Sequence, residues 1–229
     1  MIRIALINPS FKRSELCHSA FLEWIGNADD PLSIEYLIGL DSVDSTVGEY
    51  ESIFTDSDRS KAGRFLIDIG DSTNAIQAMN RVANIMSSTV ELIVVVSDDI
   101  GCFPHWDTEI FKCLSPFDNF TQPKLLYVND GYWPYGTVLT NYIANRAFYD
   151  RLGYILCPEY TSMFSDKELT DVGRILDAFI MVPHLTFLHK HYTKGLSPFD
   201  ETYARRNNQV EFSKNEAVYN DRKSRNFEL

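Results

Sequence analysis

The stretch Leu92-Ile93-Val94-Val95-Val96-Ser97-Asp98-Asp99 decides the fold of this chain. Its first five residues are aliphatic without interruption, a pattern typical of a central strand that is covered on both faces. Polar residues follow directly, so the strand ends where two adjacent carboxylates begin. We therefore predict a buried strand over Leu92–Val96 with acidic side chains at its carboxyl end.

Apolar runs and helical stripes alternate on both sides of this strand. The runs that we expect to be strands, or extended in the last case, are Ile2–Ile7, Ile34–Leu40, Phe65–Ile69, Leu125–Val128 and Phe179–His191. The stripes that we expect to be helices are Ser14–Trp24, a segment from Ser72 or Thr73 to Met86, a segment from Thr140 or Asn141 to Leu152, and Asp166–Leu176. Strands that alternate with helices predict an α/β domain with a mainly parallel sheet, which binds ligands at the carboxyl ends of its strands.

Two polar stretches complete the chain. Ser45–Gly63 has few apolar anchors and is predicted to be a long loop. Ser213-Lys214-Asn215-Glu216 fits a capping box, so we expect a short helix near the C-terminus. With no linker composition and no internal repeat, the sequence predicts a single domain over residues 1–206 and a polar C-terminal extension over 207–229.

The composition is that of an ordinary globular protein. Of 229 residues 45% are hydrophobic, and 32 acidic against 21 basic side chains give a formal net charge of −11, which disfavours nonspecific binding to nucleic acid or anionic membranes. The four cysteines form no CxxC pair and suit a reducing compartment. No apolar run approaches the ~20 residues of a membrane span. We therefore expect a cytoplasmic protein with no membrane span.

Carboxylates lie at or directly after the ends of three of the predicted strands. The pairs are Asp41 and Asp44, Asp68 and Asp71, and Asp98 and Asp99. Because the carboxyl ends of parallel strands share one edge, these groups converge, and their mutual repulsion favours a bound cation. We interpret Asp68 and Asp71 as turn residues. For Asp98 and Asp99 we favour a site for Mg²⁺ or Mn²⁺ that bridges phosphates.

Two later segments carry groups that are common in catalytic sites. His189 and His191 lie two residues apart, so on an extended strand both imidazoles face the same side. In Phe164–Leu169, either Ser165 or Asp166 caps the following helix, or Asp166 is a catalytic carboxylate. Local sequence alone does not separate these alternatives.

The order of these motifs along the chain resembles that of the GT-A glycosyltransferases, particularly the family 2 type. The stretches that carry the resemblance are Asp71-Ser72-Thr73-Asn74-Ala75 with Asn80, Val94–Asp99, Phe164–Leu169 and His189–His191, which together span Ile2–Tyr203. The resemblance implies a single GT-A domain, with a donor-binding half at about 1–107 and an acceptor-binding half at about 108–206. It also implies transfer of a sugar from a nucleotide-diphosphate-sugar donor to an acceptor hydroxyl.

The same resemblance implies roles for individual residues. Asp41 or Asp44 would contact the nucleobase or ribose, and Asn74 and Asp98 would also contact the donor. Asp99 would bind the divalent metal, together with His189 or His191. Asp166 would be the general base of an inverting reaction. The acceptor is left open as a glycan, a metabolite, a protein or a modified base.

The sequence also departs from the family pattern. Ser97 stands where the first aspartate of the Asp-x-Asp motif is usual, and Ser165 stands where a glutamate is usual. The Gln-x-x-Arg-Trp motif of processive synthases is absent, which disfavours polymer synthesis. Aromatic residues that could stack on a sugar, or simply pack in the core or at the rim, are Trp106, Tyr132, Trp133 and Tyr135.

Other function classes fit less well. Asn8–Arg13 contains no glycine, which argues against a Rossmann oxidoreductase, and no P-loop motif occurs. A sugar-phosphate nucleotidyltransferase would need a Gly-rich basic loop after the first strand, at which only Lys12 and Arg13 hint. The remaining alternative is a catalytically inactive GT-A domain that binds nucleotide-sugars or carbohydrates.

Overall fold

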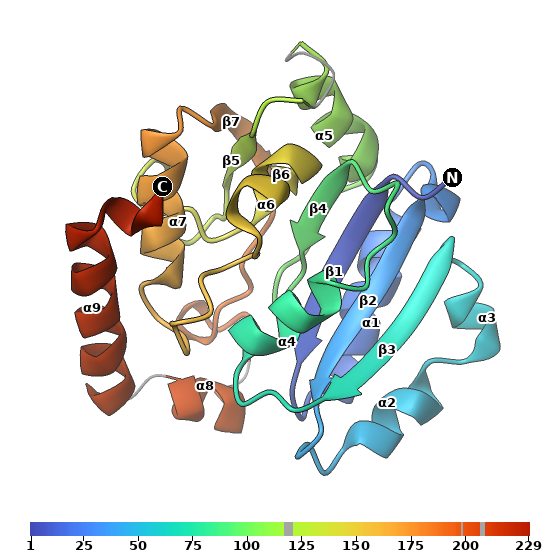
Figure 1. The fold of residues 1–229 in the computed structure, drawn as a ribbon. Coiled ribbons are helices and arrows are strands. Elements are labelled where there is room, and N and C mark those ends of the chain that lie inside the picture. Colours follow the sequence, from blue (N-terminus) through green and yellow to red (C-terminus); the bar gives the residue numbers. More distant parts are fainter. Residues whose placement is uncertain (117–120, 198, 207–208) are drawn as a thin grey trace.

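The computed structural model describes residues 1–116, 121–197, 199–206 and 209–229. Within them a seven-stranded sheet has the order β3-β2-β1-β4-β6-β5-β7 (Figure 1). The strands are β1 (Ile4–Ser10), β2 (Ile34–Asp41), β3 (Arg64–Gly70), β4 (Leu92–Val95), β5 (Leu125–Asn129), β6 (Ile143–Asn145) and β7 (Phe179–Thr186). β6 is antiparallel to both β4 and β5, and the other pairings are parallel. The mainly parallel α/β sheet is therefore confirmed.

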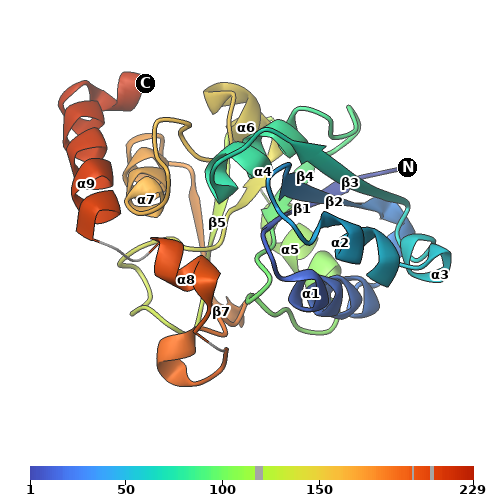
Figure 2. The same cartoon turned by 90° about the horizontal axis from the view of Figure 1, so that it is seen from below.

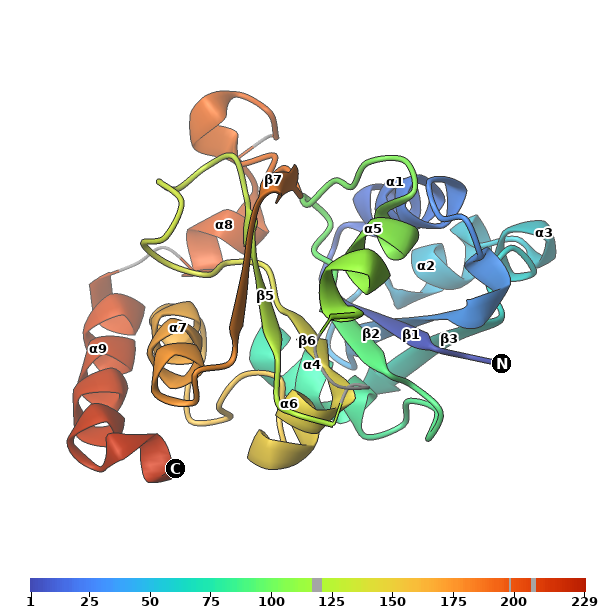
Figure 3. The same ribbon diagram turned by 90° about the horizontal axis from the view of Figure 1, so that it is seen from above.

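The helices form two layers, one on each face of the sheet. Their bounds are α1 (Ser14–Gly26), α2 (Val47–Ile53), α3 (Asp56–Arg59), α4 (Ala75–Ala83), α5 (Trp106–Leu114), α6 (Arg146–Leu152), α7 (Ser165–Ile175), α8 (Glu201–Arg206) and α9 (Gln209–Ser224). Figures 2 and 3 show α1, α2 and α5 on one face and α4 and α6 on the other. α7 lies beyond β5 and β7, and α9 packs on its outer side (Figure 1).

Each helix layer has its own apolar core. On the first face Phe21 and Trp24 of α1 pack with Trp106 of α5, and all three are almost fully buried. On the second face Val82 of α4 packs with Phe148 of α6. Residues 4–7 of β1 contribute alternately to both cores and are fully buried, as expected of a strand covered on both faces. Burial of each isoleucine or leucine side chain among them contributes about 1.5–3 kcal/mol.

Two sequence predictions about secondary structure are wrong. The stretch 45–63 contains α2 and α3 rather than a long loop; Tyr50 anchors α2 in the core, and Thr55 and Asp58 form a capping box for α3. Helices of 7 and 4 residues are too short to show a clear apolar period. The segment that begins at Thr140 or Asn141 contains the short strand β6, and Asn145 rather than either residue caps α6.

The ends of two other helices also differ from the sequence prediction. The sequence favours Ser14 as the residue that caps the first helix, but α1 already begins at Ser14 and its N-cap residue is Arg13. The Ser14 hydroxyl bonds Glu49 on α2 instead. The C-terminal helix is longer than expected: α9 has 16 residues, so Ser213 lies inside it rather than at its cap. A buried polar network described below holds this helix on α7, which the local capping pattern could not reveal.

The topology brings several polar residues to one edge of the sheet. β1, β2, β3 and β4 are parallel, so the residues that follow them meet at the carboxyl edge. The link 176–178 between α7 and β7 is short, which makes α7 run opposite to β7. The N-terminal end of α7 therefore lies on the side of this same edge (Figure 1). No helix among the described residues is both long and apolar enough to cross a membrane.

Candidate active site at the carboxyl edge of the sheet

Asp99 is a buried carboxylate at this edge, with 6% of its surface exposed. Ser97 donates a hydrogen bond of 2.6 Å to its Oδ1, and the hydroxyl of Tyr203 donates one of 2.5 Å to its Oδ2. Nε2 of His189 lies 3.7 Å from the same Oδ2. Burial alone would raise the pKa of Asp99, but these partners and the imidazole charge hold it well below its usual range. Asp99 is thus an ionised carboxylate.

Asp98 lies beside Asp99, but its pKa is shifted in the opposite direction. Burial, with the Asp99 charge adding to it, raises the pKa of Asp98 to about 7, although Arg13 nearby and a 2.8 Å hydrogen bond from Ser10 act in the other direction. Two adjacent carboxylates that titrate at very different pH values are a feature of functional sites. Near neutral pH, Asp98 is therefore divided between its acid and its carboxylate.

His189 owes its position to a strand-like contact between two loops. Ile100 and His189 form an antiparallel bridge, and the backbone N–H of Lys190 donates to the carbonyl of Asp99 at 2.7 Å. The imidazole Nε2 faces Asp99, and Nδ1 is buried with no hydrogen-bond partner among the residues that the structure describes. His191 lies alongside, with ring centroids 5.1 Å apart, but its Nδ1 is bonded to Thr193. Of the two predicted histidines, His189 is the one that pairs with Asp99.

Asp99 and His189 suit a divalent cation in their chemistry. Two ligands of one ion lie at most about 4 Å apart, since each bond is about 2.1 Å, and the 3.7 Å separation falls within this limit. Among the described residues no group of three His, Cys, Asp or Glu side chains is placed to hold a metal by itself. Mg²⁺-type sites commonly use one or two protein ligands together with substrate phosphates. The residues present fit a site of that kind.

The residues near the ends of β2 and β3 that were predicted to contact the donor form hydrogen bonds within the chain. Asp41 is 4% exposed and accepts from the Ser72 hydroxyl. Asp44, equally buried, accepts from the backbone N–H of Lys12 at 2.7 Å and from Thr46. Asn74 caps α4 by accepting from the N–H of Gln77, which lies 3.0 Å away. These three residues shape the edge of the sheet, and their contact with a donor stays a prediction.

Asp166 lies in the first turn of α7, and its Oδ1 accepts the N–H of Lys167 at 2.8 Å. Burial raises the pKa of this carboxyl. The structure thus places Asp166 at the helix N-terminus, on the side of the sheet that carries Asp98 and Asp99. Capping and catalysis both remain compatible with this position.

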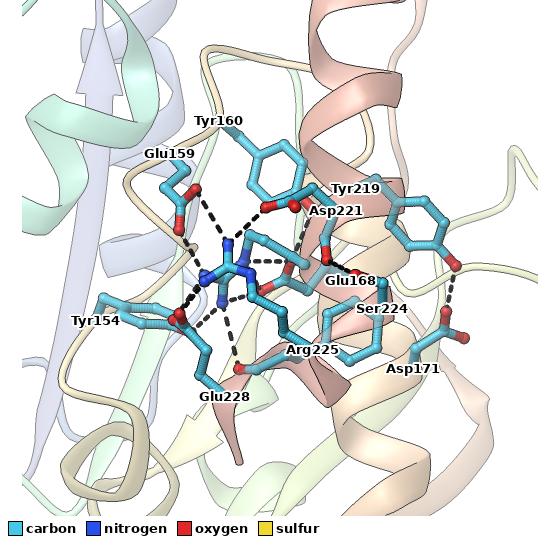
Figure 4. Close-up of polar contacts among 12 residues, drawn as sticks. Tyr154, Glu159, Tyr160, Glu168, Asp171, Tyr219, Asp221, Ser224, Arg225 and Glu228 are labelled. Carbon is cyan, nitrogen blue, oxygen red and sulfur yellow. Dashed lines mark hydrogen bonds and ion pairs between the residues drawn. The ribbon is translucent and has the colours of Figure 1, made fainter.

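Glu168 holds α7 in place from the other side of the helix. It is 3% exposed and accepts hydrogen bonds from Nε and Nη2 of the buried Arg222 of α9, and one of 2.7 Å from the hydroxyl of Tyr160. Figure 4 shows this cluster between α7, α9 and the preceding loop, where Glu159, Tyr154 and Glu228 surround the same charge. Glu168 is therefore a structural residue of the helix that carries Asp166.

Three residues of this edge were not among the predicted site residues. Ser10 ends β1 and bonds Asp98, Arg13 is the N-cap residue of α1, and Tyr203 comes from α8, 104 residues after its partner Asp99. The only sequence signal was the basic pair Lys12-Arg13, considered solely as a hint of a nucleotidyltransferase loop. A contact over such a sequence distance leaves no local pattern.

The predicted aromatic residues separate into core and rim. Trp106 is fully buried beside Trp24, so of its two alternatives it packs in the core and does not stack on a sugar. Tyr132 lies next to His191, with ring centroids 4.6 Å apart. Trp133 is 50% exposed and packs edge-on against Tyr132. The loop after β5 thus lines the side of the candidate site.

No protein-family model matches the chain, and no curated protein sequence matches it. Solved structures do. TarS of S. aureus in complex with UDP-GlcNAc superposes with a TM-score of 0.63 at 12% identity, over 89% of this chain and 61% of that one. The mannosyltransferase PcManGT of Pyrobaculum calidifontis, in complex with GDP-Man and Mn²⁺, gives 0.59 at 12% identity over 97% and 75%.

The chain has a GT-A-like glycosyltransferase fold. This confirms the fold that the motif order predicts, while the low identities limit the likeness to the fold itself. A longer TarS structure matches over 81% of this chain but only 36% of its own length. The chain thus spans about a third to three fifths of the TarS chains it matches. In the GT-A fold described here, Asp99, His189 and Asp98 lie together at the carboxyl edge after β4.

Proposed function

We propose that this chain is a metal-dependent glycosyltransferase, which moves a sugar from a nucleoside-diphosphate-sugar to an acceptor hydroxyl. The observation that carries the proposal is the buried, ionised Asp99 with His189 3.7 Å away, at the carboxyl edge of a GT-A sheet. The structural neighbours that bind UDP-GlcNAc or GDP-Man with Mn²⁺ support the same class of donor.

Asp99 and His189 are the residues that would hold the divalent ion, with diphosphate oxygens as further ligands. Such an ion stabilises negative charge as the diphosphate leaves. Asp98, which titrates near neutral pH, is suited to a hydrogen bond with a hydroxyl of the ribose or sugar. These residues bind and orient the donor, because they lie at the edge of the sheet where parallel α/β folds bind ligands.

Asp166 is the proposed general base on the acceptor side. At the N-terminus of α7 it is separate from Asp99 and His189, which would hold the metal, and its raised pKa makes it a better proton acceptor than an ordinary aspartate. In an inverting transfer it would take the proton of the acceptor hydroxyl as that oxygen attacks the anomeric carbon. The nucleoside diphosphate leaves from the opposite face.

Calorimetry with UDP, GDP, CDP and dTDP tests the donor class directly. We expect one nucleotide to bind clearly better in the presence of Mn²⁺, and EDTA to weaken its binding. Hydrolysis of the matching nucleotide-sugars then separates an enzyme from an inactive binding domain. Failure of all four nucleotides to bind, with either Mn²⁺ or Mg²⁺, would contradict the proposal.

A further inference from the structure

We propose that Arg13 binds the diphosphate of the donor, and that Asp200 takes the place of this diphosphate when no donor is bound. The stretch 199–206 would thus compete with the donor within the same chain. The inference rests on the proposed function, which it extends by naming a further donor-binding residue and its internal competitor.

Arg13 is built into the site rather than exposed on the surface. It follows β1, is the N-cap residue of α1 and has only 7% of its surface exposed. Its positive charge faces Asp98 and Asp99, which are close enough to influence its titration. A buried guanidinium at the N-terminus of a 13-residue helix is well placed to bind an anion.

An anion of this chain already occupies the guanidinium. Nε of Arg13 donates to Oδ2 of Asp200 and Nη2 donates to Oδ1, both at 2.7 Å. This paired geometry is the one by which arginine recognises carboxylates and phosphates alike. Because a diphosphate presents the same pairs of oxygens with more charge, it can replace the carboxylate of Asp200 on the same two donors.

The stretch that carries Asp200 makes several contacts to the site. Besides the Arg13 pair, the ring of Tyr203 lies 4.6 Å from the Arg13 guanidinium, and its hydroxyl bonds Asp99. Lys12 pairs with Glu201 at 3.1 Å, but the Glu201 side chain is 68% exposed. Phe199 is 60% exposed as well. The stretch also packs on Tyr192, whose ring centroid lies 4.6 Å from that of Tyr203, but its polar contacts to Arg13 and Asp99 use groups that the donor and its metal would need.

Electrostatic repulsion prevents the Asp200 carboxylate and the donor diphosphate from binding Arg13 at the same time. Asp98, Asp99 and Asp200 already face the single guanidinium of Arg13. A diphosphate brings further negative charge, so it gains Arg13 only if Asp200 leaves. The same movement withdraws the Tyr203 hydroxyl from Oδ2 of Asp99, the oxygen that His189 faces. Release of one stretch would thus free the diphosphate contact and the metal ligand together.

This arrangement has a measurable consequence. When only a fraction of the molecules has the site open, the observed dissociation constant is the intrinsic one divided by that fraction. Weakening the Arg13–Asp200 contact therefore tightens donor binding. Damage to the fold would have the opposite effect, so the sign of the change is diagnostic.

The test is calorimetry of the preferred nucleoside diphosphate with Mn²⁺ on a set of matched variants. Asp200→Asn and Glu201→Gln each remove one negative charge from the same stretch. We expect Asp200→Asn to tighten nucleotide binding by about tenfold. The substitution weakens the charge-assisted pair of hydrogen bonds to Arg13 that competes with the nucleotide. Glu201→Gln, which breaks an exposed ion pair, should stay within about threefold of wild type.

Two further variants complete the test. Arg13→Gln should weaken nucleotide binding by at least about tenfold and should abolish the gain from Asp200→Asn in the double variant. Tyr203→Phe keeps the ring over Arg13 but frees Asp99, so Mn²⁺ alone, followed by electron paramagnetic resonance, should bind more tightly.

The outcomes separate the two proposals. If wild type binds a nucleotide but Asp200→Asn binds it equally or more weakly, or Arg13→Gln binds it as wild type does, the competition is refuted while the donor class stands. If neither wild type nor Asp200→Asn binds any of the four nucleotides, the proposed function fails and the inference fails with it.

Discussion

Arg222 and Glu168 form a buried ion pair that joins α9 to α7, with Nε 2.8 Å from Oε2 and Nη2 2.9 Å from Oε1. Both side chains are almost fully enclosed, at 2% and 4% exposure. Figure 4 shows Glu168 within the polar cluster between α7 and α9. Glu168 lies two residues after Asp166, so the pair holds the first turns of the helix that carries the proposed base. The C-terminal helix thereby contributes to the shape of the candidate site without reaching it.

Replacing Arg222 should destabilise the protein strongly. Arg222→Met leaves Glu168 buried without its counter-charge, which costs about 3–5 kcal/mol. Arg225→Met is the matched control, because Arg225 is 42% exposed and pairs with Asp221 and Glu228 at the surface, where loss costs about 1 kcal/mol or less. Urea unfolding measures both free energies. Equal effects of the two substitutions would contradict the structural role of the buried pair.

The two carboxylates after β4 should differ in metal binding. Asp99→Asn removes the ionised group and should lower Mn²⁺-dependent nucleotide affinity by at least about 10–100-fold, the loss seen when even a partner of a metal ligand is removed. Asp98→Asn should weaken it less, because Asp98 is partly protonated near pH 7. Calorimetry at pH 7 measures both. Equal affinities of the two variants would argue against Asp99 as the metal ligand.

The histidines should separate in the same assay. His189→Ala should impair Mn²⁺-dependent binding, since His189 faces Asp99, whereas the His191 ring is bonded to Thr193. We expect His191→Ala to bind Mn²⁺ nearly as wild type does. The reverse pattern would reassign the ligand to His191.

Asp166→Asn should leave donor and metal affinity almost intact and lower the rate of sugar transfer, or of donor hydrolysis, by roughly 10²–10⁴. Asparagine keeps the shape and the contact to the N–H of Lys167, so the free energy of unfolding should barely change. Glu168→Gln is unsuitable as a control because Glu168 is buried against Arg222. Asp150→Asn, at an exposed aspartate of α6, is the control instead. A fully active Asp166→Asn variant would leave this residue only its capping role.

The stability of the metal-free protein should depend on Asp98 and pH. The folded-state pKa of about 7 lies above the unfolded value of about 3.9, so ionised Asp98 destabilises the fold. Below pH 4 the Asp98 carboxyl is protonated in both the folded and the unfolded state and does not lower the free energy of unfolding. The loss of stability grows as the pH rises and is complete above pH 7. Asp98→Asn should therefore raise stability by roughly 1 kcal/mol or more at pH 8, in EDTA, and not at pH 4. An equal gain at both pH values would exclude this titration.

Sequence alone determined the architecture, because its signals were local. The aliphatic run Leu92–Val96 could be stable only as a covered strand, and its alternation with helical stripes implied a parallel sheet. The same alternation placed Asp98 and Asp99 at the carboxyl edge. Short elements escaped prediction, since the three residues of β6 are too few to show a period and are held by pairing with β4.

Tertiary structure decided which of the candidate groups act together. It chose His189 over His191 as the partner of Asp99, gave Asp98 and Asp99 opposite protonation behaviour, and brought Arg13 and Tyr203 to the same edge. These outcomes depend on burial and on contacts between segments as much as 190 residues apart, as Arg13 and Tyr203 are. Side-chain pKa values and long-range contacts follow from the packed chain, because desolvation and Coulomb energy are set by three-dimensional neighbours rather than by sequence neighbours.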